Sequence, residues 1–294
     1  SFKIRGVGHL CMKLKQREQQ CQRVICSSGG NAGLACAYAC LKLHLKSIVV
    51  TPITTSNRIR TLISEYGSEV ITQGGVWNEA DEFARRLVEK DEGSSVYLPP
   101  FDHEDIWIGV SSIIDELVEQ LPTDMKPYAI VQSVGGGGLL NGILYGLKNY
   151  SEWSDVNVIA METEGADCFS QALKAKQLVT LPAITSMAKS LGALTVSSKS
   201  YELSHLFNLH SYVLPDAQAV QACKQFLDDH RMLVELASGV SLAFIYSNLF
   251  NEEKKQIKLP SNCTDESPII IIVCGGSGIT MESLTQLCEQ FNLN

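Results

Sequence analysis

Short apolar runs alternate with helix-patterned segments along most of this chain. Residues 46–51 (K-S-I-V-V-T) have the composition of a buried strand, and residues 57–66 have helical spacing before Gly67. This β-α-β-α order predicts mostly parallel sheets with helices on both faces, because parallel strands need a crossover between them. The predicted strands are residues 23–26, 46–51, 68–72, 95–98, 128–134, 156–161 and 269–273. The predicted helices are residues 33–43, 57–66, 78–90, 106–120, 139–148, 218–229 and 237–250, with one more near the C-terminus.

The strand–helix pattern is interrupted near Pro99-Pro100 and then begins again. A chain of 294 residues also exceeds the usual size of one domain. We therefore predict two α/β domains, a smaller one at residues 1–103 and a larger one at residues 104–294. Each is expected to be an open, twisted, mostly parallel sheet flanked by helices. The cleft between them is the expected place for a ligand or cofactor.

Composition argues against several classes of partner. The net charge of -8 argues against a nucleic-acid partner, because phosphate binding needs a basic surface, and it offers no attraction to anionic lipid. No apolar run is long enough to span a membrane. The ten cysteines form neither a C-x-x-C pair nor a zinc-finger spacing, so they predict buried, reduced thiols in a cytoplasmic protein.

Three loops that follow predicted strands are unusually rich in glycine. They are residues 26–33 (C-S-S-G-G-N-A-G), 135–138 (G-G-G-G) and 274–278 (C-G-G-S-G). In parallel α/β sheets ligands bind at the carboxyl ends of strands, and glycine lets backbone N–H groups converge on an anion. One such loop would be interpreted as a tight turn, but three in one chain indicate anion sites.

The loops fit neither the P-loop pattern G-x-x-x-x-G-K-[ST] nor the dinucleotide pattern G-x-G-x-x-G. Near the start of the chain, Lys3 lies between Phe2 and Ile4. A lone lysine is more often solvated surface, but an amine desolvated by apolar neighbours becomes a nucleophile or a base. Lysine together with a glycine-rich phosphate cup is the combination that pyridoxal phosphate requires.

Several motifs resemble those of the fold-type II pyridoxal-phosphate enzymes, which are tryptophan synthase β-like. Residues 1–6 (S-F-K-I-R-G) are similar to the signature around the Schiff-base lysine. Residues 27–33 are similar to the asparagine loop of the L-serine dehydratase/L-threonine deaminase branch. Residues 135–138 resemble the phosphate-binding tetraglycine, and residues 273–277 resemble the stretch near the cofactor's ring nitrogen. The similarity runs in order along the whole chain and includes residues 99–102, 160–163 and 234–235.

The resemblance implies a role for each residue of these motifs. Lys3 would form the Schiff base with pyridoxal phosphate and then remove the α-proton of the substrate. Phe2 and Ser190 would lie against the two faces of the cofactor ring, Cys274 would face its nitrogen, and Asn31 would contact its 3′-oxygen. The other implied ligands are Ser27, Ser28, Gly29, Gly30 and Asn31 for the substrate carboxylate, and Gly135, Gly136, Gly137 and Gly138 for the phosphate.

Some members of the family bind a monovalent cation, such as K⁺, beside the phosphate loop. The resemblance assigns this site to the Glu162 side chain and to backbone carbonyls of Gly135, Ala166, Leu191 and Ala193. One carboxylate with several carbonyl oxygens suits a hard cation. The alternative interpretation of Glu162 is a capping or surface acid.

The implied activity is that of a lyase acting on small amino acids. L-serine would give pyruvate and ammonia, and L-threonine would give 2-oxobutanoate and ammonia. The resemblance also implies a cytoplasmic homodimer in amino-acid catabolism and gluconeogenesis. Two alternatives stay open. One is another fold-type II activity, such as a serine racemase with Ser28 as its second base, although the longer asparagine loop argues against it. The other is a catalytically impaired homologue.

Three departures from the family pattern bear on these expectations. Gly29 and Ser190 stand where many members have alanine. In the family, a further segment of the larger domain precedes the S-F-K signature. We therefore expect an N-terminally truncated chain with Lys3 on a mobile end.

Overall fold

The computed structural model describes residues 1–17, 21–91, 93–123, 125–264 and 266–293. The chain forms two compact units, Ser1–Val110 and Ser111–Asn294, and the division falls inside helix α5 (Glu104–Gln120). The limits of the two functional domains, 1–103 and 104–294, stay a prediction. Among the residues described, none of the helices combines the length and the apolar character that crossing a membrane requires.

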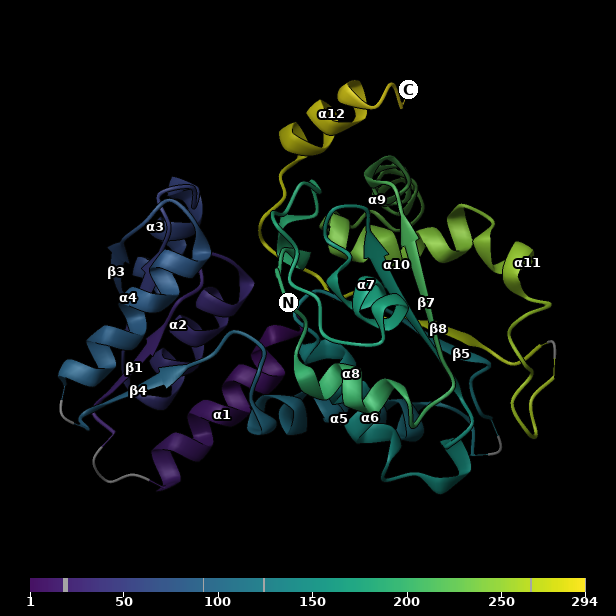
Figure 1. Cartoon of the computed structure of the whole chain (residues 1–294), viewed down its shortest axis with the longest axis horizontal. Coiled ribbons are helices and arrows are strands. Elements are labelled where there is room, and N and C mark those ends of the chain that lie inside the picture. The colour runs from purple at the N-terminus through teal and green to yellow at the C-terminus, as the bar shows by residue number, and fades with distance from the viewer. Residues whose placement is uncertain (18–20, 92, 124, 265, 294) are drawn as a thin grey trace. The chain divides into compact units, whose positions relative to one another are not determined.

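The first unit is a four-stranded parallel sheet in the order β3-β2-β1-β4, drawn in purple and blue in Figure 1. A helix lies between each pair of consecutive strands, which allows every pair of neighbours to be parallel. The strands are β1 (Arg23–Cys26), β2 (Lys46–Thr51), β3 (Glu69–Thr72) and β4 (Ser95–Leu98). The helices are α1 (Lys3–Arg17), α2 (Asn31–Leu43), α3 (Asn57–Glu65) and α4 (Trp77–Lys90).

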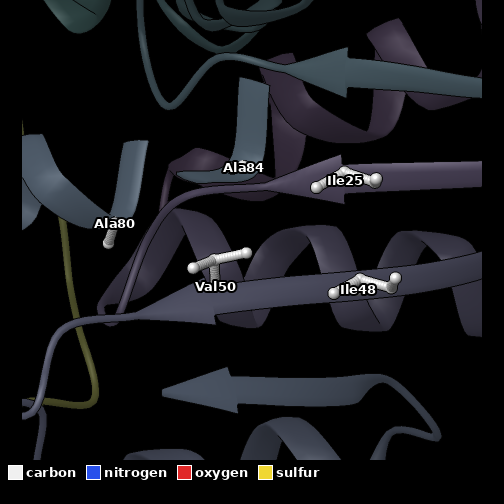
Figure 2. Close-up of a cluster of buried hydrophobic side chains, with 5 residues drawn as sticks. All are labelled: Ile25, Ile48, Val50, Ala80 and Ala84. Atoms are coloured by element: carbon white, nitrogen blue, oxygen red, sulfur yellow. The ribbon is translucent and has the colours of Figure 1, made fainter. Parts of the chain in front are cut away.

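Strand β2 is buried on both faces, as its continuous apolar sequence predicts. Ile48 and Val50 pack with Ile25 of β1 against Ala80 and Ala84 of α4 (Figure 2). The two alanines are four residues apart on one face of α4, so their small side chains let the helix lie close to the sheet. On the opposite face of β2, a second cluster is formed by Val49, Leu34, Ala37, Ile59 and Ile63.

The second unit has a parallel sheet in the order β7-β6-β5-β8. Its strands are β5 (Ala129–Ser133), β6 (Asn157–Thr163), β7 (Leu209–Leu214) and β8 (Ile269–Ile271). Its α-helices are α6 (Gly138–Leu147), α7 (Cys168–Ala175), α8 (Ser198–Ser204), α9 (Asp216–His230), α10 (Leu236–Tyr246), α11 (Leu249–Glu253) and α12 (Met281–Gln290). Two 3₁₀ turns are η1 (Ser151–Trp153) and η2 (Lys189–Leu191). The predicted fold class, parallel sheets flanked by helices, is confirmed.

Local differences from the sequence prediction have physical causes. Strand β8 ends at Ile271 and is only half-buried, because it is an edge strand that pairs with β5 alone. The predicted helix over residues 237–250 is divided into α10 and α11 at Asn248, which has a left-handed backbone (φ 64°). Strand β7 was not predicted, since its sequence mixes histidine and serine with apolar residues. All ten cysteines are free thiols, and nine are buried.

Truncation of Ile25 should destabilise the first unit. The side chain is fully buried between β2, β4 and α4, so Ile25→Ala should lower the free energy of unfolding by about 2–5 kcal/mol. Urea denaturation followed by circular dichroism would measure the change. Ile53→Ala is the matched control, because Ile53 is 64% exposed and its loss should be nearly neutral. Equal destabilisation by the two variants would contradict the assigned core.

Candidate active site

Lys3 lies at the carboxyl end of the first sheet. It begins helix α1, and its Nζ donates a hydrogen bond to the carbonyl oxygen of Pro100 at 3.0 Å, just beyond the end of β4. The same Nζ lies 5.2 Å from the centroid of the Phe2 ring. Lys3 was expected on a mobile end, and the structure instead gives its amine a defined partner. The amine belongs to a helix and is tethered to the loop after a strand.

The loop of residues 27–30 connects β1 to α2, whose first residue is Asn31. Ser27 is fully buried, whereas Ser28, Gly29, Gly30 and Asn31 are partly exposed. The N–H of Gly30 donates to the Ser28 hydroxyl at 3.3 Å, which closes a small turn. Partly exposed polar groups at the start of a helix can receive a carboxylate.

Two glycines of this segment stand where no side chain fits. A Cβ at Gly33 would lie 1.9 Å from the carbonyl oxygen of Ser28, so α2 approaches the loop backbone directly. A Cβ at Gly29 would lie 1.9 Å from the Oγ1 of Thr55, which is buried. In this chain Thr55 therefore occupies the space that an alanine at position 29 would need.

The tetraglycine loop connects β5 to α6 in the second unit. Gly137 has a left-handed backbone (φ 91°), and a Cβ there would lie 2.0 Å from the Ser200 Oγ. Behind the loop is a buried hydrogen-bond network: Ser200 Oγ donates to Asn141 Oδ1 at 2.8 Å, and the N–H of Ser197 donates to the Gly136 carbonyl at 3.1 Å. The loop is thus held without side chains of its own, and the first N–H groups of α6 point toward it.

Cys274 follows β8 and is buried. Its Sγ lies 3.3 Å from the Ser238 Oγ and 3.8 Å from the Ser133 Oγ. Burial raises the pKa of the Cys274 thiol, so it stays neutral near pH 7. Ser190 lies in η2 and is exposed.

The loop after Cys274 is fixed by a buried acid that the motifs did not single out as a site residue. Glu235 Oε1 accepts a hydrogen bond from the N–H of Gly278 at 2.6 Å. Gly276 has a φ of 140°, and a Cβ there would lie 2.2 Å from the same carboxylate. Glycine is therefore required at position 276, because Glu235 occupies the space beside it.

Glu162 is a fully buried carboxylate on β6. It accepts hydrogen bonds from the N–H groups of Phe169 (2.9 Å) and Ser170 (2.7 Å), in the first turn of α7. Burial outweighs these bonds and raises the pKa of Glu162 to about 8. The structure contradicts the surface-acid interpretation, whereas an acid beside a helix N-terminus agrees with the capping one.

Other residues predicted for the cation lie near the tetraglycine loop. Gly135 packs against Leu191, since a Cβ on Gly135 would lie 3.0 Å from the Leu191 Cα and carbonyl oxygen. The Cys168 Sγ, at the start of α7, donates to the Gly135 carbonyl at 3.8 Å. Ala166 is buried, and Ala193 donates its N–H to the Leu191 carbonyl at 2.7 Å. Within the described residues, no group of three or more His, Cys, Asp or Glu side chains could hold a metal ion, so a cation here would depend on carbonyl oxygens.

The predicted residues fall into two groups, one in each unit. The first unit contains Phe2, Lys3, Ser27, Ser28, Gly29, Gly30 and Asn31. The second unit contains Gly135, Gly136, Gly137, Gly138, Glu162, Ala166, Ser190, Leu191, Ala193 and Cys274. Sequence reasoning missed the side chains that contact Ser27, namely Asp81 and Tyr97, and Arg85, which pairs with Asp81. The four-residue spacing of Asp81 and Arg85 was visible, but it is typical of an ordinary surface pair on a helix.

These features define an α/β protein that has an anchored lysine in its first unit and a glycine loop, supported by buried hydrogen bonds, in its second. The family described as pyridoxal-phosphate dependent enzyme matches residues 1–275, and the chain belongs to that family.

Within that family, the chain is similar to proteins named as serine dehydratases, serine ammonia-lyase and threonine deaminase. The human protein named "Serine dehydratase-like" is 46% identical over 98% of this chain and 84% of its own length. The "L-serine dehydratase/L-threonine deaminase" of Bos taurus is 44% identical over 100% of this chain and 87% of its own length. The L-serine ammonia-lyase structure from the fungus Rhizomucor miehei superposes with a TM-score of 0.90 at 36% identity, covering 99% of this chain and 89% of that one. The structure of threonine deaminase isoform 2 from Solanum lycopersicum superposes with a TM-score of 0.85 at 26% identity. The match covers 100% of this chain and 76% of that one.

The burial of Glu162 makes a prediction about pH. An acid whose pKa is raised on folding binds its proton more tightly in the folded state, so it contributes less stability as pH rises from about 4.5 to about 8. Glu162→Gln removes this titration, and the stability of the variant relative to the wild type should increase across that range. Thermal unfolding at a series of pH values, in a buffer whose only cation is a bulky organic one, would measure it. Glu164→Gln is the control, since Glu164 is exposed; the same trend in both variants would contradict the assignment.

Proposed function

We propose that this chain catalyses the pyridoxal-phosphate-dependent dehydration and deamination of L-serine to pyruvate and ammonia. L-threonine would give 2-oxobutanoate and ammonia by the same route. The observation that carries the proposal is the anchored amine of Lys3, 3.0 Å from the Pro100 carbonyl beside the Phe2 ring, at the carboxyl end of a parallel sheet. The names of the relatives and of the fungal structure support the choice of substrate.

The residues present fit pyridoxal phosphate. A phosphate group needs a cradle free of side chains, and the tetraglycine loop provides one, with Gly137 in a conformation that favours glycine. The neutral thiol of Cys274 suits a ring nitrogen that is left without a proton. When bound, the cofactor supplies an aldehyde for the amine and a ring that accepts the electron pair released at the substrate Cα.

The chain's own residues would then perform three tasks. Lys3 would hold the cofactor through its amine and would move the proton at the substrate Cα. The N–H groups and hydroxyl of residues 28–31 bind the substrate carboxylate at the positive end of α2. Gly135, Gly136, Gly137 and Gly138 donate backbone N–H groups to the phosphate, which orients the reacting atoms. The family resemblance further suggests a homodimer that acts in cytoplasmic amino-acid catabolism and gluconeogenesis.

The lysine makes the proposal testable by absorbance. The purified chain mixed with pyridoxal phosphate should develop a visible band that L-serine alters, with pyruvate released. Lys3→Ala should lose both the band and the activity, because the variant lacks the amine that would form the Schiff base. Lys13→Ala, on the same helix, is the matched control and should retain both.

The remaining outcomes discriminate between functions. Pyruvate formation that survives Lys3→Ala would contradict the role of Lys3. Formation of D-serine without pyruvate would favour a racemase, which the serine racemase structure of Dictyostelium discoideum (TM-score 0.80, 26% identity) makes worth assaying. Absence of both products in the wild type would overturn the proposed activity.

A monovalent cation such as K⁺ is proposed at Glu162. A buried carboxylate whose hydrogen bonds come from backbone N–H groups gains stability from a nearby positive charge. K⁺ should therefore raise the melting temperature of the wild type more than an equal concentration of tetramethylammonium does. The extra shift should vanish in Glu162→Gln and persist in Glu164→Gln. Equal shifts in all three proteins would show that K⁺ acts elsewhere.

A further inference from the structure

Four polar side chains of the first unit, Ser27 and three others from one helix and one strand, form a closed network. The Ser27 Oγ donates to Asp81 Oδ1 at 2.5 Å and lies 3.0 Å from the Tyr97 hydroxyl. The Tyr97 hydroxyl donates to the same Asp81 oxygen. Arg85 donates from Nε to Asp81 Oδ2 at 2.8 Å, and its guanidinium lies 4.1 Å from the centroid of the Tyr97 ring. Ser27 is the first residue after β1, Asp81 and Arg85 belong to α4, and Tyr97 belongs to β4.

Within this network Asp81 is ionised and Tyr97 is neutral at neutral pH. Burial disfavours the Asp81 carboxylate, but hydrogen bonds from Arg85, Ser27 and Tyr97 outweigh burial and hold the pKa of Asp81 below its ordinary value. Burial and the bond to Asp81 raise the pKa of Tyr97, so the phenol keeps its proton. Asp81 is therefore an ionised acceptor at neutral pH, which makes its hydrogen bonds charge-assisted and stronger than neutral ones.

The network controls the first residue of the loop that precedes α2. Because the Ser27 side chain is fully buried and its hydroxyl is engaged by Asp81, it is oriented toward protein rather than toward a ligand. Two further contacts hold the next residues: the backbone of Gly33 against the Ser28 carbonyl, and Gly29 against Thr55. The partly exposed groups of residues 28–31 thus follow a path fixed at three points, of which Ser27 is the first.

We propose that Asp81 and Tyr97 are positioning residues for substrate recognition, which fix the residue 28–31 loop through Ser27 so that it receives the substrate carboxylate. This inference rests on the proposed function for the identity of the ligand. A network kept only for stability would be served as well by apolar groups of similar size, since burying a carboxylate is costly. Arg85 contributes less, because its side chain is 54% exposed and surface ion pairs are weak.

The test compares Tyr97→Phe and Asp81→Asn with a matched control on the same helix. Glu82 and Arg86 form an exposed pair with the same four-residue spacing, at 3.1 Å, so Glu82→Gln changes a similar charge without touching Ser27. Tyr97→Phe keeps the ring under Arg85 and removes only the hydroxyl. Misplacement of a binding loop should raise the KM for L-serine by about ten- to a hundredfold. The kcat should change much less, because the carboxylate is bound alike in the ground and transition states.

A second measurement works without turnover. Hydrogen exchange of peptides covering residues 27–32 should accelerate in Tyr97→Phe and Asp81→Asn but not in Glu82→Gln. An unchanged KM together with exchange equal to that of the control would overturn the proposal, and so would a fall in kcat at constant KM. If Asp81→Asn does not fold, Tyr97→Phe decides alone. A wild type without any serine turnover overturns the proposed function, while the exchange comparison still decides whether the network fixes the loop.

Discussion

Parallel pairing of neighbouring strands is the constraint from which the rest of this structure follows. In a parallel sheet all strands end at the same edge, so the loops that lead into helices start side by side. Cys26 of β1 is paired with Leu98 of β4, and therefore the loop that begins at Ser27 and the segment that reaches Pro100 start together. Ser133 of β5 is likewise paired with Met161 of β6, which places the tetraglycine loop beside Glu162. The register, not any single contact, brings together residues that are far apart in the sequence.

A half-buried carboxylate, Asp81, and a fully buried one, Glu162, show how surroundings decide what an acid can do. Asp81 has a guanidinium and two hydroxyls as donors, and its pKa is held low. Glu162 has two backbone N–H groups, and burial raises its pKa to about 8. Asp81 is therefore an ionised acceptor whose oxygens receive hydrogen bonds from Ser27, Tyr97 and Arg85. In the second acid the ionised form is incompletely compensated, so the proton is retained to a higher pH, and this is why a cation is proposed at Glu162 and not at Asp81.

Glycine acts in this protein mainly through the space it leaves. Gly33 lets α2 touch the Ser28 carbonyl, Gly137 makes room for the Ser200 hydroxyl, and Gly276 makes room for the Glu235 carboxylate. In each case a neighbouring group fills the place of a Cβ and so fixes the loop. The glycine-rich loops are therefore closely packed against neighbouring groups, and a loop that is already ordered pays less conformational entropy when it binds a ligand.

The sequence by itself determined the fold class and most of the strands. Residues 23–26, 46–51 and 95–98 were predicted with the bounds that the structure has, because continuous apolar runs between turn residues are a local signal. The three glycine-rich segments were also recognisable, since each motif is contiguous, but their edges differ: Cys26 ends β1, Asn31 begins α2 and Gly138 begins α6. The half-buried edge strand β7 and the helix that contains Lys3 were missed, because neither has a strong local pattern.

Only the tertiary structure decided which side chains support those motifs. Asp81 reaches Ser27 across 54 positions of sequence, and Glu235 reaches Gly278 across 43. It also decided that Glu162 is buried and that Lys3 is tethered to Pro100, 97 positions away. Such contacts depend on strand order and on how helices pack over the sheet. A local sequence pattern predicts neither the strand order nor the helix packing, because the same amphipathic helix can cover any strand whose face is apolar.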